Sequence, residues 1–325
     1  MIGQFRSLNL LNLFILFFLV FILRIGLYVQ LPENINTGFS EVGNRLLLFY
    51  PDNLFNPFTN VTLAAIVVFI QALLFNRIVN NFNIIGKATF LPALVYIVSS
   101  SVFTPFLFLS PPLICNFFLL FIVYRILAPS KETDFIAPMF DLGLITAVAT
   151  IFYFPFVGMV LILWLALLIF RPFNWREWIA VILGFCTIIF CLGVYYFWND
   201  KLAAFYAIWR PLTGAFPIFV KIQLQDYIVL LPITIGLLLG FYHLRENFFK
   251  SFVQVRKTFQ LLFFIFIIAA FTFYLKPDYR INHFHLAVIP VSALLAYYFL
   301  QANKKWFYEP LFLCIIGFIV YFQFV

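Results

Sequence analysis

The sequence predicts an all-α protein that crosses a membrane many times, and two observations support that prediction. First, 65% of the 325 residues are hydrophobic and only 10% are charged, whereas a soluble domain carries about a quarter charged residues. So few charged side chains cannot cover a chain of this length in water, and lipid must contact much of its surface. Second, apolar residues form continuous runs such as Leu261–Ala270, whereas transmembrane strands would alternate apolar and polar residues.

Each expected span is an uncharged run bounded by charged residues, proline or asparagine, since roughly 20 apolar residues cross a bilayer core about 30 Å thick. About eleven such spans are expected within a single transmembrane domain, residues 1–325. They are Leu8–Val29, Thr59–Asn76, Thr89–Phe103, Phe106–Tyr124, Leu142–Phe154, Phe156–Phe170, Ile179–Trp198, Tyr227–Tyr242, Phe259–Leu275, Leu286–Leu300 and Phe307–Val325. The outer loops long enough to have structure are 30–58, 199–226 and 276–285.

The distribution of Lys and Arg predicts how the spans are oriented. Short cytoplasmic loops are enriched in these residues, and most of the 20 Lys and Arg residues fall on one side if the N-terminus lies inside. The expected topology is therefore N-inside and C-outside. It places most of the net charge of +8 at the cytoplasmic face, where insertion and anionic headgroups explain the charge without nucleic acid. Membrane lipids are the expected partners.

Two of the expected spans are too short to cross a bilayer alone. Leu142–Phe154 would be roughly 20 Å long as a helix, against a core of about 30 Å, and Thr89–Phe103 is similar. Each is followed at once by a partner span across a proline-marked break, so these hairpins are expected to leave a recess towards the outer face. The alternative is that Phe135–Phe140 also belongs to the fifth span.

Ionisable residues within the spans are rare, which gives little support for a pump or an ion channel. Arg24 lies within the first span and is expected to snorkel outwards from its end. The motifs typical of soluble enzymes, such as a Walker loop, GxGxxG, GxSxG and HExxH, are absent from the sequence. Any chemistry is therefore expected on the outer face.

The polar residues of the outer side combine carboxylates with basic groups. A carboxylate held there could act as a general base on an acceptor hydroxyl, and a basic group could neutralise a phosphate leaving group. Each such residue taken alone is more often a solvated loop charge. Two histidines do not define a metal site, so no metal is expected. The candidate catalytic residues are Glu33 and Glu41, and the candidate substrate-binding residues are Asp52, Arg210, Arg280, His283 and His285.

Three features follow one another along the chain: an acidic outer loop after the first span, a pair of hairpins of short spans, and a late basic-aromatic segment before a proline-containing span. They comprise Glu33 with Glu41, then Asp141–Gly143 with Phe170–Trp178, then Asp278–Leu286 with Ile289–Leu294. Their order resembles that of the GT-C superfamily of multi-pass membrane glycosyltransferases.

This resemblance implies a GT-C-like arrangement of helices and a transferase activity. The implied reaction moves a sugar from a polyprenyl-phosphate donor to an envelope acceptor on the outer face of the bacterial inner membrane. By the same resemblance the catalytic acid is Glu33 or Glu41, and Arg280 contacts the donor phosphate. No cofactor is implied beyond the sugar linked to polyprenyl phosphate.

The 49 phenylalanines and the segment Arg171–Trp178 also look like a family of bacterial inner-membrane proteins with no assigned activity. Two alternatives therefore stay open. One is a non-catalytic subunit of a membrane complex, built on a GT-C scaffold and bound to membrane-protein partners. The other is a lipid or solute transporter, which predicts a cavity that opens to both sides.

Overall fold

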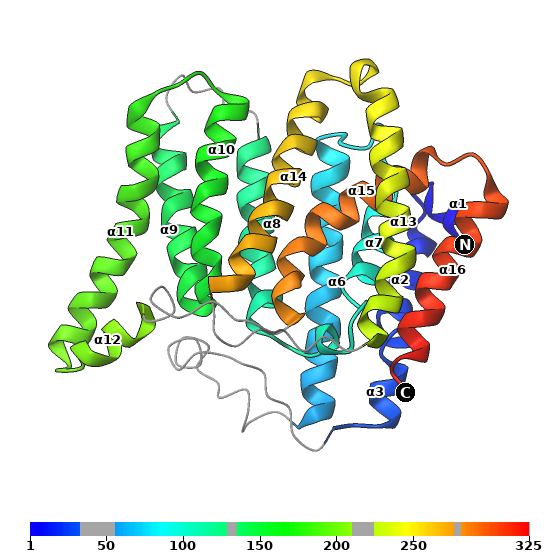
Figure 1. Ribbon diagram of the computed structural model, residues 1–325, viewed down its shortest axis with the longest axis horizontal. Coiled ribbons are helices and arrows are strands. Elements are labelled where there is room, and N and C mark those ends of the chain that lie inside the picture. Colours follow the sequence, from blue (N-terminus) through cyan, green and yellow to red (C-terminus); the bar gives the residue numbers. More distant parts are fainter. Residues whose placement is uncertain (33–55, 129–134, 210–223, 276–280, 325) are drawn as a thin grey trace.

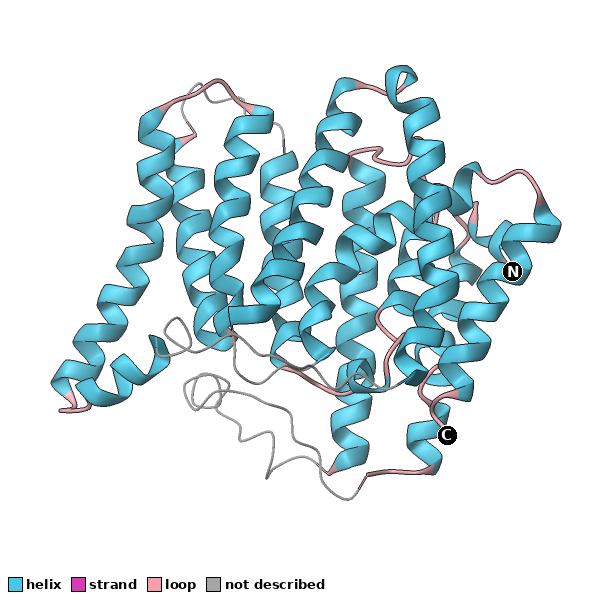
Figure 2. Ribbon diagram, in the orientation of Figure 1, coloured by secondary structure: helices cyan, strands magenta, loops and turns pink. Residues whose placement is uncertain are grey.

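The computed structural model describes residues 1–32, 56–128, 135–209, 224–275 and 281–324. Every regular element in these ranges is a helix, as the sequence predicts (Figure 2). The helices pack side by side into one bundle, with α11 at one edge and α16 at the other (Figure 1). The all-α class is therefore confirmed for the described residues.

Five stretches of helix in the described residues are long and apolar enough to cross a bilayer, which makes the chain a membrane protein. They contain α6 (Pro57–Asn81), α11 (Trp175–Trp198), α13 (Leu224–Asn247) with η4 (Phe248–Lys250), α14 (Val253–Thr272) with η5 (Phe273–Leu275), and η6 (Ile281–Ala287) with α15 (Val288–Gln301). The other helices are shorter. They are α1 (Ile2–Phe5), α2 (Leu10–Ile22), α3 (Ile25–Val29), α7 (Leu91–Ser99), η1 (Thr104–Leu107), α8 (Pro111–Leu127), α9 (Ile136–Phe152), η2 (Phe154–Met159), α10 (Val160–Phe170), α12 (Leu202–Trp209) and α16 (Lys305–Tyr321).

The two expected spans that are too short to cross a bilayer differ in length in the structure. Helix α9 begins at Ile136 and has 17 residues, so the alternative in which Phe135–Phe140 belongs to the fifth span is the better one. Helix α7 has only 9 residues, all of them buried. Its length of about 14 Å at the helical rise is too short for α7 to cross a bilayer as a helix on its own, and its residues are buried within the bundle.

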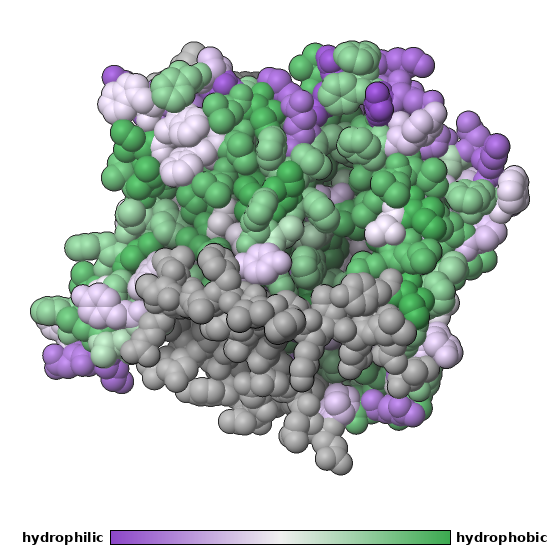
Figure 3. Space-filling model, in the orientation of Figure 1, coloured by the Kyte–Doolittle hydropathy of each residue, from purple (hydrophilic) through white to green (hydrophobic). Residues whose placement is uncertain are grey.

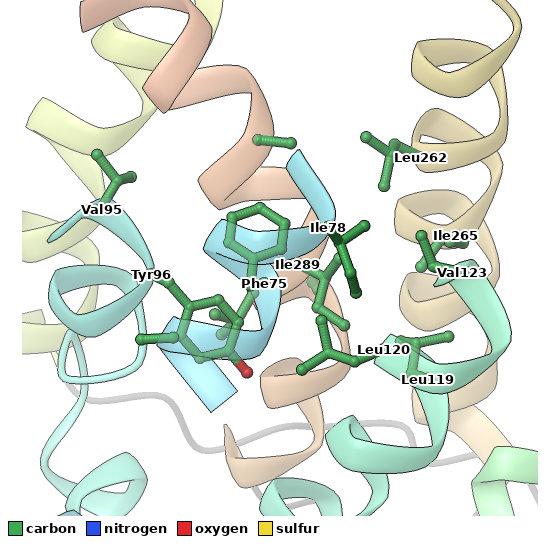
Figure 4. Close-up of a cluster of buried hydrophobic side chains, with 14 of the residues drawn as sticks. Phe75, Ile78, Val95, Tyr96, Leu119, Leu120, Val123, Leu262, Ile265 and Ile289 are labelled. Atoms are coloured by element: carbon green, nitrogen blue, oxygen red, sulfur yellow. The ribbon is translucent and has the colours of Figure 1, made fainter. Parts of the chain in front are cut away.

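The interior of the bundle is a continuous apolar core to which most helices contribute. Figure 4 shows a part of it in which side chains from α6, α7, α8, α14 and α15 meet. The outward surface is equally apolar: Phe190, Leu238 and Phe271 are each more than two-thirds exposed. Figure 3 shows a broad hydrophobic band below a hydrophilic upper edge. A bundle that is apolar inside and outside fits a lipid solvent. The core residues labelled in Figure 4 are Phe75, Ile78, Val95, Tyr96, Leu119, Leu120, Val123, Leu262, Ile265 and Ile289.

Helix α11 is attached to the bundle mainly through α9, and two glycines bring their backbones into contact. A Cβ at Gly143 in α9 would overlap the carbonyl of Val181, and a Cβ at Gly184 in α11 would overlap the carbonyl of Phe140. Only 17% of the most apolar stretch of α11 is buried. In lipid, where the hydrophobic effect does not drive helices together, such close packing of small residues holds them.

A methyl group added at this contact should therefore loosen α11. We expect Gly184→Ala to lower the stability of the protein by about 1–3 kcal/mol, because the extra atom overpacks a backbone contact. Thermal unfolding of the purified chain in detergent measures the loss. Gly317→Ala in α16 is the matched control, since a Cβ there meets no atom within 4 Å. Equal stability of the two variants would contradict this packing.

Candidate functional site

Most of the predicted site residues cannot be placed. Glu33, Glu41, Asp52, Arg210 and Arg280 lie outside the described residues, so their roles stay predictions. The structure describes only the two histidines of the predicted set. His283 and His285, which were expected in an outer loop, lie in η6 with 2% and 0% of their surface exposed.

His283 has protein partners at both ring nitrogens. Its Nε2 lies 2.6 Å from the carbonyl of Ala269, which can only accept, so Nε2 carries the hydrogen. Nδ1 is then the acceptor for the hydroxyl of Tyr153, at 2.7 Å. Thr272 lies 3.3 Å from Nε2. His283 therefore joins η6 to α14 and to the end of α9, and it keeps no nitrogen for a substrate.

His285 is held differently and keeps one ring nitrogen without a partner. Its Nε2 donates to the carbonyl of Phe106 at 3.2 Å, and its ring stacks on that of Phe106 with centroids 4.0 Å apart. Asn116 fixes the backbone of η6 by donating to the carbonyl of His285 at 2.9 Å. Because Nε2 carries the hydrogen, Nδ1 has a free lone pair, and no donor from the described part of the chain reaches it.

Arg24 lies at the break between α2 and α3, and Gln323 near the end of the chain shapes this break. The side-chain oxygen of Gln323 accepts from the amide of Gly26 at 3.1 Å, and its nitrogen donates to the carbonyl of Leu23. A Cβ at Gly26 would overlap Gln323. These contacts satisfy backbone groups that the interrupted helix leaves unpaired.

The side chain of Arg24 points into the protein and not towards the outer surface. It is 0% exposed, and its Nη1 donates to the carbonyl of Val20, one turn earlier, at 3.0 Å. The expectation that Arg24 snorkels outwards is therefore wrong, because the break turns the side chain inwards. Its Nε and Nη2 have no hydrogen-bond partner among the residues that the structure describes. A buried charge without a partner costs several kcal/mol.

Arg24 and His285 both lie beside η1: Leu27, one turn after Arg24, packs against Leu107, and the ring of His285 stacks on that of Phe106. Other buried polar atoms without partners occur on the neighbouring elements: Nδ2 of Asn60 in α6, Oγ of Ser110 before α8, and Oδ1 of Asn116 in α8. Native proteins contain few such atoms, and each calls for an explanation. We call Arg24, Asn60, Ser110, Asn116 and His285 the polar cluster. The end of the bundle that contains α3 and the start of α6 is lowermost in Figure 1.

A hydrogen-bond network supports the polar cluster from the core side. The hydroxyl of Tyr96 in α7 donates to Gln71 in α6 at 3.0 Å, and Gln71 donates to the carbonyl of Leu113 in α8 at 2.6 Å. Asn116 lies 3.4 Å from the Tyr96 oxygen. The network links α6, α7 and α8, and through Asn116 it fixes η6 with His285.

Removal of the Tyr96 hydroxyl tests this support. We expect Tyr96→Phe to destabilise the protein by about 1–3 kcal/mol, because the Gln71 oxygen loses its donor in a buried setting. Thermal unfolding in detergent measures the change. Tyr124→Phe, at a side chain 44% exposed, is the control and should have little effect. A similar small effect of both substitutions would show that the network does not hold the helices together.

The described residues contain no group of three or more His, Cys, Asp and Glu side chains that could hold a metal ion. The polar cluster instead offers hydrogen-bond donors, one cation and a ring acceptor. Together the bundle and the cluster define a polytopic helical membrane protein with a buried polar site.

The chain belongs to the family of unknown function DUF6427, whose sequence pattern matches residues 42–325. Searches of curated proteins and of solved structures found no match. Asn60, Asn116 and His285 lie within the matched range, and Arg24 precedes it. A family without an assigned activity agrees with the second resemblance drawn from the sequence.

Proposed function

We propose that the protein is a GT-C-like glycosyltransferase of the bacterial inner membrane. It moves a sugar from a polyprenyl-phosphate donor to an envelope acceptor on the outer face. The observation that supports this proposal best is the polar cluster, in which buried Arg24 has no counter-ion among the described residues. The polyprenyl phosphate that leaves in this reaction is a monoester, and it supplies both an anion for Arg24 and an apolar tail suited to the bundle.

The proposed topology has about eleven spans, with the N-terminus on the cytoplasmic side. It rests on the basic residues of the α10–α11, α13–α14 and α15–α16 connections, which lie at the upper end in Figure 1. Figure 3 shows hydrophilic residues along that edge. By the positive-inside rule this end faces the cytoplasm, and the polar cluster then lies towards the outer side. The basic residues are Arg171, Arg176, Arg245, Lys250, Lys304 and Lys305.

The acidic residues assigned to catalysis belong to the connection between α3 and α6, residues 33–55. Of the polar cluster, Arg24 directly precedes α3 and Asn60 lies within α6. In the proposed reaction a carboxylate of Glu33 or Glu41 takes the proton of the acceptor hydroxyl. The acceptor oxygen then bonds to the anomeric carbon, while the bond from that carbon to the phosphate oxygen breaks. The phosphate leaves with the electron pair, and cations stabilise it.

Substitution of the two glutamates tests the catalytic assignment. We expect the Glu33→Gln and Glu41→Gln double variant to lose transfer by about 10²–10⁴-fold, the usual contribution of a general base, while the protein still inserts into the membrane. Mass spectrometry of envelope glycans in a deletion strain that carries each variant measures transfer. Glu246→Gln, at a glutamate with 52% side-chain exposure, is the control. Unchanged glycans in the deletion strain itself would refute the proposal.

A second candidate function is a non-catalytic subunit of a membrane complex. It is favoured by the edge of the bundle, where α12 has no buried residue and α11 exposes Phe190, Tyr195 and Trp198 by 71%, 56% and 85%. Aromatic side chains of this kind suit a protein interface as well as lipid. Purification in mild detergent separates the two candidates, since stoichiometric partner proteins without bound polyprenyl lipid would indicate a subunit.

A further inference from the structure

Arg24 in the polar cluster is a cation without an anionic partner among the described residues, and its unpartnered nitrogens have a defined geometry. Arg24 uses Nη1 to donate to Val20, which leaves Nε and Nη2 without partners. These two nitrogens lie on the same edge of the planar guanidinium. Their N–H groups run parallel, and this arrangement binds two oxygens of a carboxylate or phosphate at once.

No carboxylate whose side chain the structure describes completes this pair. Glu177 pairs with Arg171 at 3.5 Å, and Glu309 with the terminal amino group at 3.0 Å. Glu246 lies beside His243, and Asp141 and Asp200 are exposed. A buried guanidinium without an anion is strongly unfavourable in a lipid-embedded bundle. Among the described residues nothing faces this edge of Arg24, and its two parallel donors fit an anion with two oxygens.

His285 restricts the chemistry of this anion. Because its Nε2–H donates to the carbonyl of Phe106, Nδ1 offers a lone pair and needs a donor. A fully ionised group cannot provide one. A singly protonated phosphate monoester provides both features, since its P–O⁻ and P=O oxygens accept from Arg24 and its P–OH donates to His285. A phosphate diester lacks that hydroxyl.

We infer that Arg24 and His285 form a binding site for a phosphate monoester, with its P–OH turned towards Nδ1 of His285. The polar atoms of the site have no contact with solvent in the described state, so the ligand enters when the helices around η1 and α3 move apart. The surroundings of Arg24 are apolar, with Leu16, Val20 and Leu23 buried on the same segment. A monoester on a hydrocarbon tail therefore suits the site. The inference rests on the proposed function and deepens it by naming the form of phosphate that Arg24 takes. Because a binding measurement alone tests it, its failure can be told apart from failure of the transfer reaction.

Thermal unfolding of the full chain in detergent, followed by the fluorescence of its 6 tryptophans, measures this binding. The probe is dodecyl phosphate, and a ligand that binds the folded state raises the midpoint as its concentration rises. Arg24→Met removes the charge and keeps the bulk of the side chain. We expect this variant to be at least as stable as the wild type without ligand, and to show no rise with dodecyl phosphate. Arg125→Met, at an exposed arginine, should respond like the wild type.

Two further variants keep the inference open to refutation if Arg24→Met does not fold. Arg24→Lys keeps the charge and loses the two parallel donors, and His285→Phe keeps a ring to stack on Phe106 and loses Nδ1. Each is expected to weaken binding about 10- to 100-fold, the range for a lost hydrogen bond to a charged group. A purely structural role for Arg24 or His285 would leave the affinity of a folded variant unchanged.

Two other probes identify the source of the phosphate. A shift with dodecyl phosphate and none with inorganic phosphate assigns the site to a lipid headgroup, whereas equal shifts assign it to free phosphate, and both outcomes support the site. Lipid nanodiscs that contain phosphatidylglycerol, a diester, should not compete. The inference is overturned by the absence of any shift in the wild type, by equal shifts in Arg24→Met and the wild type, or by equally strong binding of the diester.

Discussion

Every break in a helix of this bundle must satisfy its backbone groups without water, and the architecture depends on how this is done. Amide side chains from neighbouring helices fill that role repeatedly. Gln323 bonds both sides of the break at Arg24, and Asn60 accepts from the amide of Leu109 at 2.9 Å. Asn80 bonds both the amide and the carbonyl of Thr89. Since an unpaired backbone group in a lipid-embedded core costs several kcal/mol, these amides fix where the chain can turn.

Arg24 is one of the buried side chains whose polar atoms have no partner among the described residues, and its position follows from the same constraint. The break that exposes the carbonyl of Leu23 to Gln323 also directs the arginine side chain inwards. Thus a contact between the first helices and the last helix positions a cation inside the bundle. A protein selected for stability alone would gain from an apolar residue at this position. The retained charge is best understood as one half of a binding site whose other half is a ligand.

The sequence was sufficient for the class of fold and for the position of most helices, because long apolar runs are a strong signal for helices in lipid. It was less reliable where a charge interrupts a run. The fifth expected span begins directly after Asp141, but Asp141 is an exposed residue within α9. A charged side chain can reach the surface from inside a helix, so a charge need not mark its end.

The candidate site was harder to predict. The sequence places Arg24 within the first expected span. It does not reveal the direction in which a helix break points the side chain. His283 and His285 were expected in an outer loop because charged residues precede them. The apolar neighbours Phe284 and Leu286 pack with the core, and this segment is buried with them. The partners of both histidines come from distant parts of the chain, such as Tyr153 and Phe106, which no local pattern reveals.

The most direct test of this account is an experimental structure of the full chain purified with its native lipids. We predict density for a phosphate group within hydrogen-bonding distance of Nε and Nη2 of Arg24 and of Nδ1 of His285. A carboxylate of the chain itself in that place, paired with Arg24, would contradict the account. It would show that the polar cluster is a closed structural ion pair and not a ligand site.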